Sequence, residues 1–176
     1  FRYRPDSPTV PLRVAKLEIT AGERIAVLGR NGAGKSTFLQ ALIGGVPLEQ
    51  GELRLDSLSL PHIDVADLRR NTGLMTQNAR LFHGTLRDNL TLGAPQARDD
   101  EIFAALEMCG ADVLVRKLPH GLDHVVMEGG LGLSGGQRQS ILLARLMLRD
   151  PNIVLLDEPT ASLDEHTERD FLDRLR

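Results

Sequence analysis

A glycine-rich stretch early in the chain has the residue types that bind phosphate. Residues 29–36 read GRNGAGKS, which fits the pattern G-x-x-x-x-G-K-[S/T], with an apolar run before it and a helical pattern after it. Glycines let backbone N–H groups converge on phosphate oxygens, and the start of a helix adds a positive dipole end. Lys35 would pair with the terminal phosphates, and Ser36 would place its hydroxyl on Mg²⁺. The stretch therefore predicts a phosphate-binding loop.

Two carboxylates follow a short apolar run late in the chain. Residues 153–156 read IVLL without polar interruption, which predicts a strand buried on both faces of a sheet, and Asp157 and Glu158 come directly after it. Ligands of doubly wound sheets bind at the carboxyl ends of strands. Asp157 suits Mg²⁺, and Glu158 suits a general base that polarises an attacking water. The alternative is a pair of solvated acids at a strand end.

A third pattern, LSGGQ at residues 133–137, lies immediately before a helical stretch. Ser134 is a plausible N-cap for that helix, and the two glycines leave backbone donors exposed at its positive end. By itself the pattern fits a second anion-binding turn or a simple helix cap.

Apolar spacing predicts the elements that position these residues. Strands and helices are mixed before residue 77, the stretch 81–118 has short helices and no strand, and a long helix leads to the apolar run at 153–156. Asp64 is the predicted N-cap of a short helix. The predicted strands cover residues 14–19, 24–28, 51–56, 73–76 and 153–156, and the predicted helices cover 37–43, 64–70, 100–109, 135–149 and 164–175.

Composition limits the classes of protein that these elements can form. The chain has 176 residues, 41% of them hydrophobic and 26% charged, as expected for one ordinary folded domain. The formal net charge of −3 argues against general affinity for nucleic acid. The single Cys109 cannot form an internal disulfide and fits a reducing compartment, and the five histidines lack metal-ligand spacing. Because the first residue is Phe1 and a helical pattern runs to the end, we expect a piece of a longer polypeptide.

In this order the patterns resemble the nucleotide-binding domain of ABC transporters. Residues 29–36 match the Walker A loop, Gln77 the Q-loop glutamine, 133–137 the signature sequence and Asp157–Glu158 the end of Walker B, while 161–164 are similar to the D-loop. The resemblance implies a P-loop α/β ATPase core with a mixed or parallel sheet in residues 1–77 and 151–176. It also implies a helical signature subdomain in residues 78–150.

The resemblance implies ATP and Mg²⁺ as cofactors and assigns a role to each matching residue. Glu158, Lys35 and Gln77 would be catalytic, and Ser36, Gln77 and Asp157 would hold the metal. Tyr3 resembles the aromatic residue that stacks on adenine. The nucleotide would be bound by Tyr3, Gly29, Asn31, Gly32, Ala33, Gly34, Lys35, Ser36, Thr37, Ser134, Gly135, Gly136 and Gln137.

The resemblance also implies partners. Two copies would form a head-to-tail homodimer at the cytoplasmic face of the bacterial inner membrane, with a transmembrane domain fused upstream of Phe1 and no nucleic acid partner. Residues 81–90 are similar to exporters and 128–132 to type I secretion ATPases. The family's switch histidine would lie beyond Arg176. The alternatives are a soluble ABC ATPase that acts on nucleic acid or the ribosome, and a non-hydrolysing ATP-gated module, against which Glu158 argues.

Overall fold

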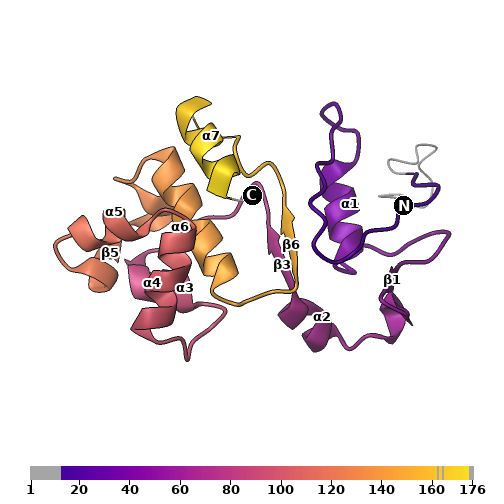
Figure 1. Ribbon diagram of the computed structural model, residues 1–176, viewed down its shortest axis with the longest axis horizontal. Helices are drawn as coiled ribbons and strands as arrows, with labels where there is room; N and C mark the ends of the chain where they lie inside the picture. Colours follow the sequence, from indigo (N-terminus) through magenta and orange to yellow (C-terminus); the bar gives the residue numbers. More distant parts are fainter. Residues whose placement is uncertain (1–12, 162, 164, 175–176) are drawn as a thin grey trace. The chain divides into compact units, whose positions relative to one another are not determined.

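The computed structural model describes residues 13–161, 163 and 165–174 (Figure 1). The chain divides into two compact units, Phe1–Arg69 and Arg70–Arg176. The phosphate-binding loop falls in the first unit, whereas Gln77, the signature and the acidic strand end fall in the second.

The first unit is built around one helix and a small hairpin. Its α2 helix is capped as expected, because Oδ1 of Asp64 accepts hydrogen bonds from the backbone N–H groups of Ala66 and Asp67 at 2.8 and 3.2 Å. The only strand pair among residues 13–69 is antiparallel. The elements are α1 (Lys35–Leu42), β1 (Arg54–Leu55), β2 (Leu58–Ser59), the 3₁₀ turn η1 (Leu60–His62) and α2 (Val65–Asn71), which continues into the second unit.

The strands predicted at residues 14–19 and 24–28 are wrong for this part of the structure, which has no strand there. The strand predicted at 51–56 forms only over β1. A strand is held by hydrogen bonds to a neighbouring strand, and neither 14–19 nor 24–28 is paired with one in the described structure. Apolar spacing can make a stretch suitable for a strand, but it cannot supply that neighbour.

The second unit joins one parallel strand pair to a group of helices. Its helix α6 contacts α3, α4 and β3, so it links the sheet to the other helices. No described helix has both the length and the apolar character that a membrane crossing requires. The elements are β3 (Thr72–Met75), β4 (Gly84–Thr85), α3 (Leu86–Thr91), α4 (Asp99–Met108), α5 (Asp112–Lys117), η2 (Gly121–Asp123), β5 (Val125–Val126), η3 (Glu128–Gly130), α6 (Gly135–Met147), β6 (Ile153–Leu156) and α7 (Glu165–Arg174).

Strands β3 and β6 are parallel and in register, from Thr72 opposite Ile153 to Met75 opposite Leu156. The predicted strand at 153–156 is thus confirmed, and so is the parallel sheet of an α/β fold. Burial on both faces is not found, because the side chain of Val154 is 37% exposed. In the described structure β6 is paired only with β3, and a sheet of two strands leaves part of one face exposed to solvent.

The helices predicted in the second unit are confirmed to within one or two residues at the ends that the structure describes. Their apolar faces form the core, and the most buried large side chains are Leu81, Leu86, Leu90, Ile102, Leu106, Val115 and Ile141. The prediction that residues 81–118 lack a strand is wrong in one detail, since Gly84 and Thr85 of β4 pair with β5. Two residues carry too little pattern for a strand to be predicted from spacing.

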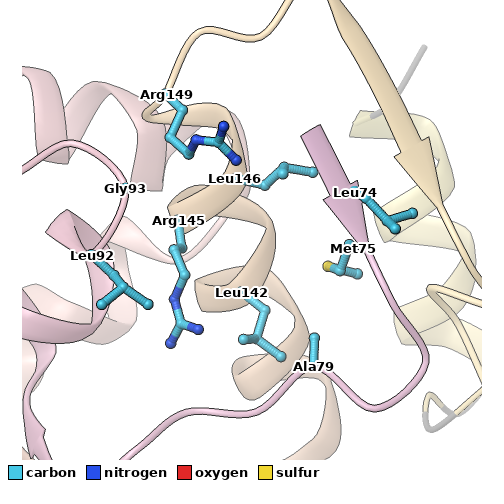
Figure 2. Close-up of a pocket in the computed structure, with 9 residues that line it drawn as sticks. All are labelled: Leu74, Met75, Ala79, Leu92, Gly93, Leu142, Arg145, Leu146 and Arg149. Carbon is cyan, nitrogen blue, oxygen red and sulfur yellow. The ribbon is translucent and has the colours of Figure 1, made fainter. Parts of the chain in front are cut away.

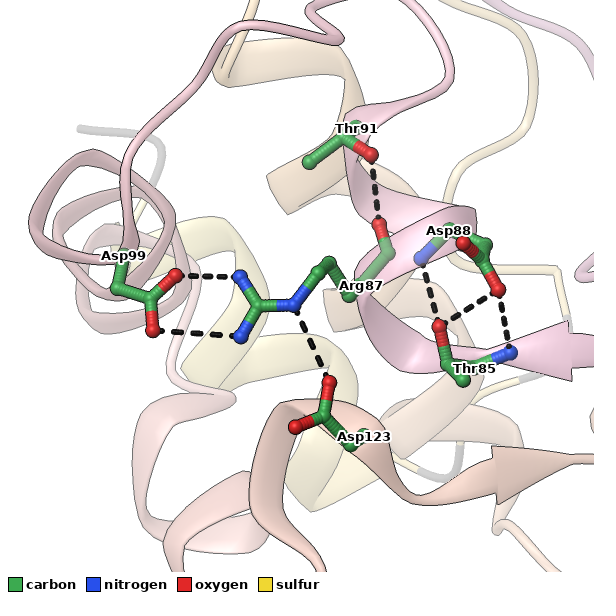
Figure 3. Close-up of polar contacts among 6 residues, drawn as sticks. All are labelled: Thr85, Arg87, Asp88, Thr91, Asp99 and Asp123. Atoms are coloured by element: carbon green, nitrogen blue, oxygen red, sulfur yellow. Dashed lines mark hydrogen bonds and ion pairs between the residues drawn. The ribbon is translucent and has the colours of Figure 1, made fainter.

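A charged network joins the helices α3, α4 and the η2 turn (Figure 3). Both terminal nitrogens of Arg87 bind the carboxylate of Asp99, and its Nε donates to Oδ1 of Asp123 at 3.2 Å. These partners raise the pKa of Arg87, and the guanidinium lowers the pKa of Asp99. Thr85 and Asp88 form a capping box at the start of α3, and the hydrogen bonds from Thr85 lower the pKa of Asp88.

Candidate functional site: a phosphate-binding loop, an acidic strand end and a signature turn

The phosphate-binding loop is folded tightly before α1. Gly34 has φ 92°, a left-handed conformation that costs glycine little and other residues more, and α1 begins at the next residue. The ammonium of Lys35 donates to the carbonyl oxygens of Gly29 and Arg30 at 3.1 and 3.4 Å. The hydroxyl-bearing side chain of Ser36 is exposed at the first turn. The loop thus has a cation and a helix N-terminus at the place where phosphate would bind.

The acidic strand end brings together two residues that lie far apart in the sequence. Nε2 of Gln77 donates to Oε2 of Glu158 at 3.0 Å, and the backbone N–H of Asp157 donates to the carbonyl of Met75 at 2.9 Å. Both contacts form because β3 and β6 run parallel and end at the same edge. Glu158 itself has φ 50°, which is unusual for a residue with a long side chain and stores backbone strain. Strain of this kind is concentrated at functional positions.

The signature turn caps α6 as the sequence predicts. Oγ of Ser134 accepts from the N–H of Gln137 at 3.2 Å, and Oε1 of Gln137 accepts from the N–H of Ser134 at 2.8 Å. This capping box satisfies two backbone donors and leaves those of Gly135 and Gly136 at the positive end of a 13-residue helix. It also engages the side chain of Gln137 within its own turn.

The structure brings some of the expected site residues together and leaves others out. Gln77 and Glu158 are in contact, whereas Tyr3 and two D-loop positions, 162 and 164, lie outside the described residues. The phosphate-binding residues belong to the first unit and are described within it. Among the described residues, no three His, Cys, Asp or Glu side chains converge on a metal position.

Three polar residues of the second unit, Asn89, Arg145 and Gln139, make contacts that the sequence patterns did not predict. Asn89 is fully buried, and both ends of its amide are hydrogen-bonded: Oδ1 accepts from Nη2 of Arg145 at 2.8 Å, and Nδ2 donates to backbone carbonyls. Burial lowers the pKa of Arg145. Gln139 of α6 donates to the carbonyl of Pro159, directly after Glu158. Polar residues at helical positions are normally interpreted as solvent-exposed, so the role of these three residues is seen only from their contacts in the structure.

A cavity of about 210 Å³ lies beside β3 in the second unit. Figure 2 shows that α6 contributes apolar side chains and Arg145 to one wall, while β3 contributes Leu74 and Met75 to another. Ala79, two positions after Gln77, lines the cavity, and so do the residues that follow α3. The full lining is Leu74, Met75, Ala79, Leu92, Gly93, Leu142, Arg145, Leu146 and Arg149.

Comparison with known proteins identifies the class that this fold and site define. The ABC transporter family matches residues 12–161, which is most of the chain. The structure is similar to a bacterial Atm1-family ABC exporter with ATP bound, over 91% of this chain and 28% of that one, at a TM-score of 0.83 and 36% identity. The chain therefore belongs to the ABC transporter family and is an ATP-binding domain of the kind that hydrolyses ATP.

Relatives of known name agree with this assignment. The cyclolysin secretion/processing ATP-binding protein CyaB of Bordetella pertussis is 40% identical over 96% of this chain and 24% of its own length. The mitochondrial iron-sulfur clusters transporter ATM1 of Debaryomyces hansenii is 36% identical over 100% of this chain and 25% of its own length. The chain thus spans about a quarter of the length of these relatives, and it resembles the ATP-binding part of exporters.

Proposed function

We propose that this domain binds Mg-ATP and hydrolyses it with the residues that the Walker A, Q-loop, signature and Walker B patterns single out. The contact between Gln77 and Glu158 supports the proposal most directly, because it unites two residues 81 positions apart at one strand end. Lys35 and the N–H groups of residues 29–37 bind the phosphates. Glu158 accepts a proton from the attacking water as general base.

The residue types proposed to hold the metal suit Mg²⁺. Magnesium prefers oxygen ligands and usually takes only one or two carboxylates together with substrate phosphates. Asp157 offers a carboxylate, Ser36 a hydroxyl and Gln77 an amide oxygen, since its amide nitrogen is used on Glu158. Bound there, the ion would neutralise charge on the phosphates.

The nucleotide site is completed by a second copy of the domain. In this arrangement the Walker A loop of one protomer faces Ser134 and Gly136 of its partner, which contact the γ-phosphate at the positive end of α6. Tyr3 stacks on adenine. ATP binds the closed dimer more tightly than the open one, and hydrolysis releases it, so differential affinity supplies the mechanical work.

Within one protomer, the ATPase core comprises residues 1–77 and 151–176, and the helical signature subdomain comprises 78–150. Core and subdomain are joined at the two ends of the subdomain, directly after Gln77 and directly before β6. The contact of Gln139 with Pro159 is a further link between the signature helix and the residue after Glu158.

The full protein is an exporter of the type I secretion class at the cytoplasmic face of the bacterial inner membrane. The relative named for cyclolysin secretion supports this class. Relatives named for iron-sulfur clusters and for multidrug resistance show that similar domains serve other cargo, so the membrane-spanning part selects what is carried. In this proposal that part is fused upstream of Phe1 and contacts the domain around the Q-loop and residues 78–82.

Mixing two inactive variants of the full-length protein tests the shared site. Lys35→Ala and Ser134→Arg each remove turnover in homodimers. If the signature acts across the dimer, a heterodimer of the two variants keeps one site with both residues intact, and the mixture regains ATPase activity. A mixture as inactive as either variant, with heterodimers demonstrated by differential tags, would show that Ser134 serves its own protomer.

Secretion tests the cargo class separately. Glu158→Gln in the full-length protein should remove a large secreted protein from the culture medium of the source bacterium while the variant remains in the membrane. An unchanged set of secreted proteins, together with lost ATPase activity, would contradict type I secretion and leave the ATPase assignment standing.

A further inference from the structure

We infer that Glu128 is a positioning residue for ATP hydrolysis: its carboxylate ties the turn before the signature to the segment that follows Gln77. The inference rests on the proposed role of Ser134 at the nucleotide. Glu128 does not touch the nucleotide in this proposal. It acts by holding the backbone that leads into the signature helix.

Two hydrogen bonds join these segments directly. The backbone N–H of His83 donates to Oε2 of Glu128 at 3.1 Å, and the backbone N–H of Gly129 donates to the carbonyl of Leu81 at 2.9 Å. Leu81 is only 1% exposed, so the segment that receives the turn is anchored in the core. The carboxylate is exposed, so a change at Glu128 removes the hydrogen bond without opening a cavity in the core.

The turn is in tight contact with the signature helix on its other side. Gly130 is buried with φ 72°, and a Cβ there would lie 2.7 Å from Cδ of Arg138 and 3.2 Å from Cδ1 of Leu81. Nη1 of Arg138 donates to the carbonyl of Leu133 at 2.5 Å, and the N–H of Leu133 donates to the carbonyl of Gly130 at 3.1 Å. A displacement of the turn is therefore passed to Leu133 and to the N-cap residue Ser134.

The segment that contains Leu81 starts at Gln77, beside the strand end that carries Glu158. Leu81 follows Gln77 by four positions, and Gln77 is hydrogen-bonded to Glu158. Glu128 thus connects the signature turn with the strand end that carries the general base. Reacting groups need placement within fractions of an ångström, and a displacement of about 1 Å can lower a rate by about 10²-fold. Loss of one hydrogen bond at an exposed carboxylate should displace the turn less than this, and we expect kcat to fall about tenfold.

The test compares three variants of the full-length protein: Glu128→Ala, Glu128→Gln and the control Glu107→Ala, which removes an exposed glutamate of α4. ATPase rates are measured against ATP concentration, nucleotide affinity by titration with a fluorescent ATP analogue, and folding by thermal melting. We expect Glu128→Ala to lower kcat about tenfold with affinity and melting unchanged. Glu128→Gln should recover most of the rate, because its amide oxygen can accept from the N–H of His83.

Each other result has a defined meaning. Rates for Glu128→Ala equal to those of Glu107→Ala would overturn the inference. Equal losses in Glu128→Ala and Glu128→Gln would overturn it too, because the charge and not the hydrogen bond would then matter, and a loss that follows melting would indicate a folding role. If Ser134→Arg keeps full turnover, the proposed role of the signature at the nucleotide is wrong, and the Glu128 inference falls with it. If Ser134→Arg is inactive while Glu128→Ala is normal, only the Glu128 inference fails.

Discussion

Replacement of Asn89 by alanine should destabilise the second unit strongly. The side chain of Asn89 is fully buried and makes four hydrogen bonds. Its Oδ1 accepts from the N–H of Phe82 at 3.0 Å and from Nη2 of Arg145 at 2.8 Å, and its Nδ2 donates to the carbonyls of Phe82 and Thr85 at 2.9 and 3.0 Å. Truncation of Asn89 to alanine removes the amide, and the four groups that it binds each lose a hydrogen-bond partner.

The size of the effect follows from those four groups. A buried polar group that loses its partner costs about 1–3 kcal/mol, and the cost is greatest where water cannot replace the partner. The hydrogen bonds to Phe82, Thr85 and Arg145 are all partly buried, so water replaces the lost amide only in part. We therefore expect the free energy of unfolding to fall by roughly 3–5 kcal/mol. Loss of this size is a large share of the stability of an ordinary domain.

Urea denaturation of the purified chain, followed by circular dichroism at helical wavelengths, measures this loss. Tryptophan fluorescence cannot be used because the chain has no tryptophan. The matched control is Asn78→Ala, since Asn78 is exposed, and it should change the free energy of unfolding by less than about 0.5 kcal/mol. A loss below about 1 kcal/mol for Asn89→Ala would refute the reasoning, because it would mean that the four hydrogen bonds contribute little net stability.

Three further predictions concern the site and the charged network. Glu158→Gln should retain ATP binding and lower kcat by about 10²-fold or more, since glutamine keeps the shape but cannot take a proton; an unchanged rate would place the general base elsewhere. Lys35→Ala should weaken binding of both ATP and ADP at least tenfold in a titration, and equal affinities would remove Lys35 from the phosphate site. Arg87 lowers the pKa of Asp99 in the folded state. The ionised carboxylate of Asp99 therefore stabilises the fold at neutral pH, and this stabilisation is lost progressively as the pH falls below about 4. Wild type and Asp99→Asn should therefore differ in stability at about pH 6, the difference should shrink as the pH falls below the ordinary pKa of aspartate, about 4, and a difference independent of pH would exclude this ion pair as its source.

The phosphate-binding loop and the signature turn could be recognised from the sequence because their physical requirements are local. Backbone donors converge on an anion only where glycines and a helix start follow one another within a few residues, as in residues 29–36. The caps of α2 and α6 are local as well, since Asp64 and Ser134 bind N–H groups two or three positions away. Helix spacing in the second unit was predictable for the same reason, because each helix satisfies its own backbone.

Strands depend on partners, and here the sequence was a poorer guide. Residues 14–19 and 24–28 have strand-like composition, yet in the described structure no strand pairs with them, while the two-residue β4 forms because β5 lies beside it. Burial of β6 also depended on its neighbours, since pairing with β3 alone leaves Val154 exposed.

The polar contacts of the second unit were decided by tertiary structure. The sequence by itself determined that Gln77 and Glu158 are of types that could serve an ATP site, and the parallel pairing of β3 with β6 brought their side chains within a hydrogen bond. In the same way, packing of α3 against α6 joined Asn89, which is fully buried, to Arg145, which is partly buried. Residue type and local spacing specify which chemistry is possible. Contacts across tens of residues depend on how complete elements bury their apolar faces, a property of the whole chain that no short pattern contains.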